Sequence, residues 1–515
     1  MNFRHGGLIG CVLAVVTACS PLPGDHVRTP SYVLPVTETA TTALGQVIAP
    51  LTAEREEQSG IVTLAEAKDA FAARLRLASA AERTLDIQYY IWRDDKTGLL
   101  LMQALYNAAQ RGVRVRFLLD DLNSHPIEAK LIALNQHPNI EVRVFNPFVV
   151  RGARTLGFIT DFSRANRRMH NKSFTADNQA TIIGGRNVGD DYFSGMDGVL
   201  FADLDALAIG DVVPYVSHDF DAFWNSLSAY PLESLTNDMS SAQRKQVIAA
   251  IFEEHEASEL YLQSVYDREL VRSMLTEDGP LLWAQTRMVS DNPAKGLGTA
   301  EPEQLITHAL QEIIGQPAKS VYLVSPYFVP TKAGVEALES LAERGVEIHI
   351  LTNSYAASDV AIVHSGYAKW RKRLLHAGIH LYEMRSSVEV GVTEQDTQPI
   401  ARFGSSASSL HAKTFAVDGE RVFIGSFNFD PRSAKLNTEL GFVIESPELA
   451  RQTESIFAEE VPYSAYELRL APSGRMYWLE QNPGHSRRHD IEPESKLWQR
   501  MKVTFFSWLP IDWLL

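Results

Sequence analysis

HNKSFTAD at residues 170–177 and HAKTFAVD at residues 411–418 repeat a histidine, a lysine and an aspartate at one spacing. The second copy begins 241 residues after the first (411 − 170 = 241). Each copy is followed by a second apolar run, and the turn dipeptides Asp177-Asn178 and Asp418-Gly419 lie between the runs. Such dipeptides between apolar runs predict a β-hairpin. The chain is therefore expected to contain two similar domains, each with one His–Lys pair on a hairpin.

The segments upstream of the two octapeptides repeat as well. An apolar strand pattern, a helical pattern ending in Arg-Gly-Val and a second strand pattern occur in each half, at residues 84–92, 98–112 and 113–121, and again at 320–330, 333–345 and 346–353. Strands that alternate with helices predict an α/β fold with a parallel or mixed sheet flanked by helices. The predicted domains span residues 61–240 and 290–515, with an inter-domain connection at 241–289 and their site at the interface.

The first residues predict an export signal. Arg4 and His5 precede the apolar run of residues 8–18, which is too short to span a membrane. Residues 1–18 are therefore interpreted as a signal peptide. Val-Thr-Ala before Cys19 is similar to the lipobox of bacterial lipoproteins, which makes Cys19 the predicted lipidation site; the alternative is a plain secretory signal. Residues 19–60, rich in Pro, Thr and Ala, are expected to form a tether.

Composition excludes several classes of protein. The net charge of −15 disfavours a general basic surface for nucleic acid. The two cysteines, Cys11 and Cys19, both belong to the predicted signal and its lipidated end, so the mature domains contain no disulfide and no cysteine-type zinc site. The remaining histidines show no ligand-like spacing, and no metal or other cofactor is predicted.

The repeated motif suits the chemistry of a phosphodiester. Side chains two residues apart share one face of a strand, so His170 lies beside Lys172 and His411 beside Lys413. If the two motifs face each other, two lysines can hold the anionic oxygens of a phosphodiester. One histidine can then attack phosphorus while the other protonates the leaving alcohol.

Further polar residues recur at matched positions. Asn187 and Asn428, which follow Gly-Gly-Arg and Gly-Ser-Phe, are predicted to bind substrate through their amides, although a loop role is the alternative. Asp203 and Glu439 lie 33 and 28 residues after the two histidines and are candidates to orient the rings, with Asp205 as a competitor of Asp203. Asp177 and Asp418 belong to the motif, and either catalysis or turn formation explains them.

The duplicated HxKxxxxD motif, followed by GG or GS and then xN, resembles the signature of the phospholipase D superfamily. Longer stretches such as LDIQYYIWRDD, SLHAKTF, IGSFNFDPRS and NTELGFVIES are similar to bacterial cardiolipin synthase C-like proteins. This resemblance covers nearly all of the predicted mature chain and implies two homologous phospholipase D-like domains. It also implies metal-independent transfer of a phosphatidyl group through a phosphohistidine, with His170 as nucleophile and His411 as acid/base.

The resemblance implies phosphatidylglycerol as acceptor, cardiolipin as product and phosphatidylethanolamine as a candidate donor. Hydrolysis to phosphatidic acid, a nucleic-acid phosphodiesterase and a non-catalytic lipoprotein remain alternatives. Larger cardiolipin synthases begin with two membrane-spanning helices, whereas this chain begins with a lipoprotein-like signal. We therefore expect a lipid-anchored, periplasm-facing protein of the cell envelope, and Ser20 after Cys19 favours the outer membrane.

The C-terminal stretch LWQRMKVTFFSWLPIDWLL is apolar and rich in tryptophan. Its apolar residues recur at near-helical spacing beside basic residues, which is typical of a helix at a bilayer interface. Packing onto the second domain is the alternative. Oligomeric state is not predicted.

Overall fold

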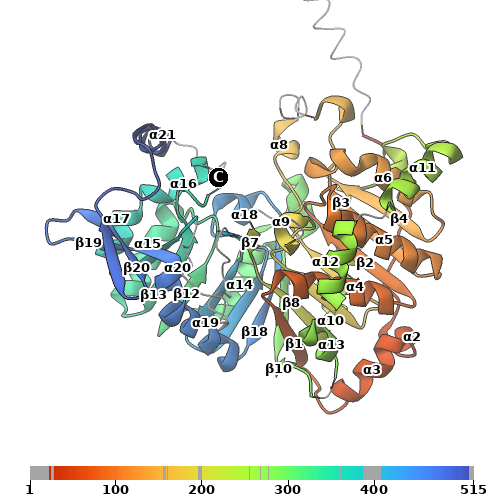
Figure 1. The fold of residues 1–515 in the computed structure, drawn as a ribbon, viewed down its shortest axis with the longest axis horizontal. Coiled ribbons are helices and arrows are strands. Elements are labelled where there is room, and N and C mark those ends of the chain that lie inside the picture. The colour runs from red at the N-terminus through yellow and green to blue at the C-terminus, as the bar shows by residue number, and fades with distance from the viewer. Residues whose placement is uncertain are drawn as a thin grey trace, which may run out of the picture.

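Two α/β domains lie side by side in the computed structural model (Figure 1). The structure describes residues 22–24, 28–154, 158, 161–194, 200–253, 256–266, 268–276, 278–358, 361–386 and 408–509. Each domain is built on one mixed sheet with helices on its faces, so the predicted fold class is confirmed. The predicted signal peptide and Cys19 lie outside the described residues.

The first domain contains a sheet of nine described strands. Their order across the sheet is β10 (Leu282–Ala284), β1 (Ser59–Leu64), β8 (Asp205–Gly210), β6 (Ala180–Gly184), β5 (Ser173–Ala176), β2 (Thr84–Tyr89), β3 (Arg114–Asp120), β4 (Ile140–Phe145) and β9 (Ala229–Pro231). Strands β2, β3 and β4 are parallel, and the other neighbours are antiparallel.

The second domain repeats this strand order and adds two strands, β20 and β21, at one edge of its sheet. Its strands are β11 (Thr286–Ser290), β18 (Leu440–Glu445), β17 (Arg421–Gly425), β16 (Thr414–Val417), β12 (Ser320–Val324), β13 (Glu347–Asn353), β14 (His380–Met384), β19 (Ala465–Leu470), β20 (Met476–Asn482) and β21 (His485–His489). Across the sheets, the strands from β1 to β9 and the strands from β11 to β19 correspond one to one in the same spatial order. The internal repeat predicted from the two motifs is therefore a repeat of topology.

Helices cover the two sheets and connect their strands (Figure 1). In the first half they are α2 (Val36–Thr39), α3 (Ala43–Thr52), α4 (Ala67–Ala80), α5 (Lys96–Gln110), α6 (Glu128–Asn135), α8 (Phe162–Ala165), α9 (Asp190–Phe193), α10 (Val213–Trp224), α11 (Ser241–Ile251), α12 (Glu256–Tyr266) and α13 (Glu269–Ser273). In the second half they are α14 (Ile306–Ile314), α15 (Thr331–Glu343), α16 (Ala361–Ala368), α17 (Arg371–His376), α18 (Pro431–Lys435), α19 (Pro447–Glu459), α20 (Val461–Ser464) and α21 (Leu497–Ser507).

The two motif hairpins have the backbone that their turn residues require. Asp177 and Asn178 both have positive φ, and the amide of Gln179 donates to the carbonyl of Ala176. Asp418 and Gly419 have the same conformation in the second hairpin. Two consecutive positive φ values define the tight turn whose twist matches paired strands, and Asp, Asn and Gly tolerate them. The hairpin prediction is therefore confirmed in both halves.

The sheets meet through an apolar layer between the domains. Its members come from both halves and are buried, among them Ile183, Ala206 and Ala208 of the first domain and Ile424, Phe442 and Ile444 of the second. Burial of apolar area is worth about 25 cal/mol per Å², so this layer stabilises the pair of domains as one body. The residues at the edge of this layer form the candidate site.

The predicted domain boundaries are wrong at two places. Residues 28–58 are not a tether: Arg28 donates to the carbonyl of Ala229, and Leu44 and Ile48 of α3 are buried in the core of the first domain. The predicted connection at 241–289 also belongs largely to that domain, because helices α11–α13 pack on its core and β10 joins its sheet. Compositional bias misled both predictions, since Pro and Thr also occur at helix starts and caps.

Membrane-spanning helices are not found in the described part of the chain, where no helix combines the length and apolar character needed to cross a bilayer.

Candidate active site

His170 lies at the interface between the halves, immediately before β5. Its backbone amide donates to the carbonyl of Thr438 in the second half at 2.9 Å. Its ring Nδ1 is 2.8 Å from Oε2 of Glu439, the next residue. The second half therefore holds His170 by both its main chain and its ring.

His411 lies at the matching place before β16. Its amide donates to the carbonyl of Ala202 at 2.8 Å, and its Nδ1 is 2.5 Å from Oδ2 of Asp203. The first half thus holds His411 as the second half holds His170. Strands β7 (Leu200–Ala202) and β15 (Ser408–Leu410) pair in parallel across the boundary and lead into these residues.

The two orienting carboxylates are exchanged between the domains. The sequence associates Asp203 and Glu439 with the histidines that precede them, and both residues do contact a histidine ring. Each, however, contacts the ring of the opposite half. The competitor Asp205 contacts neither ring; it binds Arg74 and the amide of Arg186. No spacing within one chain signals such an exchange.

Lys172 and Lys413 are buried beside the histidines of their own motifs. Each ammonium donates to the carbonyl of the histidine two residues earlier, and Nζ of Lys413 is 3.1 Å from Nδ1 of His411. Burial and the charge of Lys413 lower the pKa of Lys172, against the opposing charge of Glu439. Glu439 and Asp203 already oppose the charges of these lysines, and lysine ammonium groups that share one site can also hold the anionic oxygens of a phosphodiester.

The pKa values of both histidines are lowered, which favours neutral rings at neutral pH. Burial lowers the pKa of His170 to about 4, and the charge of Lys172 adds to this effect while Glu439 opposes it. Burial and the charge of Lys413 lower the pKa of His411 to about 3, against Asp203. Each half's lysine also lowers the pKa of the other half's histidine, so the four groups act on one another. A neutral imidazole with Nδ1 held by a carboxylate presents Nε2 for reaction.

The small residues after each hairpin make room for the carboxylates. A Cβ added to Gly185 would lie 2.2 Å from Oδ1 of Asp203, so a larger residue would displace that carboxylate. At the matching position Ser426 donates its hydroxyl to Glu439, and Ser433 of α18 donates to the other carboxylate oxygen at 2.8 Å. The small residue at position 185 thus allows the close approach of an orienting carboxylate. The two serines were not predicted.

Asp177 and Asp418 hold backbone rather than a reacting group. The carboxylate of Asp177 accepts from the amides of residues 82–84, which enter β2. Asp418 accepts in the same way from the amides of residues 318–320, which enter β12. These contacts favour turn formation over catalysis.

The two asparagines differ. Both ends of the Asn187 amide have a partner: its Oδ1 accepts from the amide of Ile91, and its Nδ2 donates to the hydroxyl of Tyr192. Asn428 is 5% exposed, and its Oδ1 has no partner among the described residues. Of the two, Asn428 is therefore the better candidate to accept from a substrate hydroxyl.

A possible metal-ligand group lies away from the histidine pairs. Within the described ranges, one cluster of three such ligands occurs, Glu347, His349 and His380 on β13 and β14. It was missed because His380 comes from the neighbouring strand. Asn353, at the other end of β13, binds the backbone of Leu410 next to His411, so this cluster and the candidate site lie at opposite ends of the strand.

Comparisons with known proteins agree with the duplicated fold. Residues 75–224 and 310–461 match a family model described as cardiolipin synthase, PLD-like domain. Cardiolipin synthase C of Escherichia coli (strain K12) is 47% identical over 476 residues, 92% of this chain and 99% of that protein. A cardiolipin synthase of Staphylococcus aureus (strain N315) is 23% identical over 408 residues, 78% of this chain and 67% of that protein. The crystal structure of phosphatidylserine synthase from Haemophilus influenzae Rd KW20 has a TM-score of 0.56 at 14% identity, covering 88% of this chain and 95% of that one, and supports the fold.

Proposed function

Because this chain belongs to the family of cardiolipin synthases with phospholipase D-like domains, we propose that it transfers a phosphatidyl group to phosphatidylglycerol and forms cardiolipin. The observation that carries this proposal is the exchanged pairing of His170 with Glu439 and of His411 with Asp203. It joins two imidazoles and two lysines into one site that neither domain completes alone. Phosphatidylethanolamine, or a second phosphatidylglycerol, serves as donor.

In the first half-reaction, Nε2 of His170 attacks the donor phosphorus and forms a phosphorus–nitrogen bond. The bond from phosphorus to the head-group oxygen breaks, and that oxygen takes a proton from His411. The donor phosphate brings negative charge between Lys172 and Lys413. This charge raises the pKa of both histidines above the low values that burial and the lysines give them, which allows one of them to be protonated.

In the second half-reaction, neutral His411 takes the proton of the acceptor hydroxyl. The acceptor oxygen attacks phosphorus, the bond to His170 breaks, and cardiolipin leaves. Glu439 stabilises the positive charge on the phosphorylated ring of His170, and Asp203 stabilises protonated His411. The assignment of His170 as nucleophile follows the family resemblance, because the two half-sites have nearly equivalent contacts.

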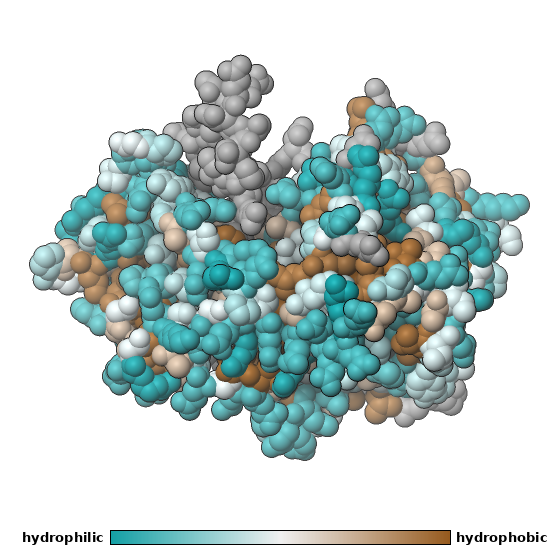
Figure 2. Space-filling model, turned by 90° about the horizontal axis from the view of Figure 1, so that it is seen from below, coloured by the Kyte–Doolittle hydropathy of each residue, from teal (hydrophilic) through white to brown (hydrophobic). Residues whose placement is uncertain are grey.

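A bilayer is the proposed location of the substrates. Helix α21 exposes an apolar row, in which Leu497, Met501, Phe505 and Trp508 are 66, 65, 58 and 80% exposed. In Figure 1, α21 and α8, which carries exposed Phe162, lie at the same end of the molecule on different domains. The opposite end is largely hydrophilic, with separate apolar patches (Figure 2).

We place this α21–α8 end against the membrane, where aromatic side chains and the nearby Lys496, Arg500 and Lys502 favour the interface. The alternative, in which the tail packs onto the second domain, accounts for the side of α21 on which Val503 is buried but not for the exposed apolar row. Lipidation of Cys19 after removal of residues 1–18, and a periplasmic location at the outer membrane, remain parts of the proposal. Flotation with anionic liposomes tests the interface: a variant lacking residues 497–515 should float less, and equal flotation would refute it.

The reaction is tested with purified protein and phosphatidylglycerol, with and without phosphatidylethanolamine, and products identified by mass spectrometry. Cardiolipin is the expected product, and His170→Ala and His411→Ala should each abolish it. Phosphatidic acid as the only product would show that water is the acceptor and would replace the proposal with a hydrolytic phospholipase D.

A further inference from the structure

An apolar groove crosses the outer face of the second sheet, between α14 and α15. Its volume is about 630 Å³, and its walls include Ile314 of α14, Leu338 and Leu341 of α15, and Val321, Leu323 and Phe415 of the sheet. Several of these side chains are only half-buried. Ligand pockets have volumes of roughly 300–1,000 Å³, so the groove has the size of a binding site.

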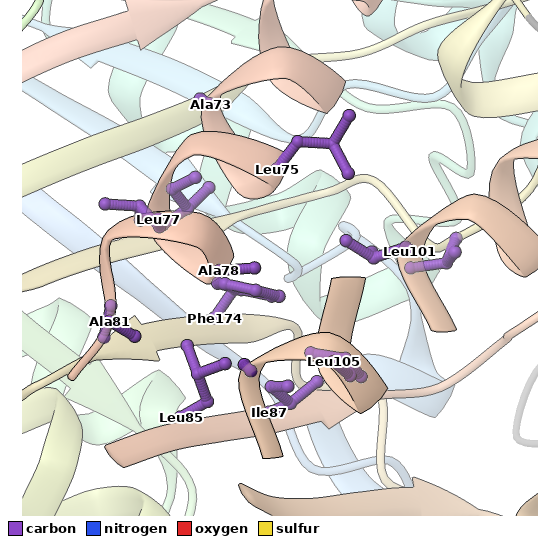
Figure 3. Packing of buried hydrophobic residues seen from close by; sticks show 14 of the residues in the cluster. Ala73, Leu75, Leu77, Ala78, Ala81, Leu85, Ile87, Leu101, Leu105 and Phe174 are labelled. Atoms are coloured by element: carbon purple, nitrogen blue, oxygen red, sulfur yellow. The ribbon is translucent and has the colours of Figure 1, made fainter. Parts of the chain in front are cut away.

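The equivalent place in the first domain is filled. There α4 packs directly on α5, and Figure 3 shows Leu101 and Leu105 of α5 packed near Ile87 and Phe174 below side chains of α4. Fully buried Leu101 lies ten residues before Arg111 of the shared Arg-Gly-Val (111 − 101 = 10).

The residue ten positions before the matching Arg344 is Gly334 (344 − 334 = 10), and it lines the groove. One further residue that lines the groove is smaller than its counterpart. Buried Trp92 corresponds to Phe328, because the bridge from Trp92 to Val188 matches that from Phe328 to Phe429. Phe429 is larger than its counterpart Val188, so the open space is assigned chiefly to Gly334 in place of Leu101.

The groove adjoins the candidate site along the chain, although no site residue lines it. Phe427 and Phe429 line it, and the residue between them is Asn428, whose buried Oδ1 has no partner among the described residues. Phe415 and Val417 of β16 also line it, and the two preceding alternate positions are Lys413 and His411. Alternate residues of an extended chain share a face, so one row of side chains leads from the site to the groove.

We propose that this groove holds an acyl chain of a phospholipid substrate, an inference that rests on the proposed function. An acyl chain matches the apolar walls and needs no hydrogen-bond partner from them. Its head group would lie at the end where Asn428 and Lys413 are found. In the first domain α4 packs directly on α5 at the equivalent place, so the two halves would bind lipid differently although their catalytic motifs match.

Gly334→Leu tests the groove by restoring the leucine of the first domain. A Cβ at Gly334 meets only ordinary contacts, of which the nearest is 3.5 Å from Pro330, and leucine favours a helix more than glycine does. The variant should therefore fold and melt no lower than the wild type. Ser340→Leu, which adds the same side chain at an exposed position of α15, is the matched control.

The assay presents dioleoyl and dihexanoyl phosphatidylglycerol together in mixed micelles and compares the cardiolipins by mass. Gly334→Leu should lower the ratio of long-chain to short-chain product by about tenfold or more, because the long chain loses its groove. Ser340→Leu should leave the ratio unchanged. An unchanged ratio in Gly334→Leu, with cardiolipin still formed, would refute the groove and leave the proposed function intact.

Photo-crosslinking tests binding of an acyl chain in the groove independently of catalytic turnover. Phosphatidylglycerol with a diazirine near the end of one acyl chain should label α14 or α15 in the wild type, and Gly334→Leu should remove that label. This result would support the groove even if no cardiolipin were formed. Labelling confined to other parts of the chain would overturn the inference.

Discussion

Replacing Glu439 by glutamine should slow formation of the phosphohistidine while keeping the site's shape. The carboxylate lies 2.8 Å from Nδ1 of His170, and burial keeps water away from both groups. With charges centred roughly 5 Å apart and an effective dielectric constant of about 20, Coulomb's law gives about 3 kcal/mol for a positively charged ring. This corresponds to a loss on the order of 200-fold in the rate of phosphoenzyme formation. Asp203→Asn should produce a similar loss through His411.

The leaving group of the donor distinguishes the two variants. A phosphatidyl ester of p-nitrophenol needs no proton for departure, so rapid-quench measurement of its phosphoenzyme should show Asp203→Asn largely restored and Glu439→Gln still slow. Glu445→Gln, at an exposed position of β18, the strand that follows Glu439, is the control. The opposite pattern would make His411 the nucleophile. If both variants reacted within about threefold of the wild type, the charge argument would be refuted.

Three further results are expected. Asp177→Ala should lower the free energy of unfolding in urea by about 3 kcal/mol, because three backbone amides lose a buried acceptor. Asp418→Ala, at a less buried turn, should lower it by about 1 kcal/mol. If the folded variants lost activity without losing stability, a catalytic role for these aspartates would be restored. The folded pKa values of His170 and His411 are about 4 and about 3, below the ordinary 6.5, so each of these groups binds fewer protons in the folded state than in the unfolded state. Buried carboxylates such as Asp120, whose pKa is raised to about 6, act in the opposite direction in the same range. The wild type should therefore lose stability relative to His170→Gln as the pH decreases from 6.5 toward 4, by up to about 3 kcal/mol; a difference in urea midpoint between the two proteins that stays constant with pH would contradict the burial argument. EDTA should leave cardiolipin formation unchanged, and inhibition that added metal reverses would count against a reaction carried by histidine alone.

Local patterns predicted much of this structure, because turn residues and strand–helix alternation act over short distances. The hairpins at Asp177 and Asp418 and the strand–helix–strand units before them follow the predicted order. The partners of the histidines could not be assigned in this way, since the exchange of Asp203 and Glu439 depends on how two domains pack. The tether was mispredicted because its Pro and Thr content is typical of linkers, whereas the apolar residues of α3 are buried only by contact with the core of the first domain.

The contacts of the two histidines also constrain how lipids enter and leave. Each domain forms hydrogen bonds to the ring nitrogen and the main-chain amide of the other domain's histidine. A hinge motion that parted the domains would therefore break the contacts that hold both histidines. Substrate exchange that left both reacting groups in place would therefore have to occur without parting the domains. The slow step of turnover would in that case be the departure of a four-chained product into the bilayer, and the fluidity of the surrounding membrane would set its rate.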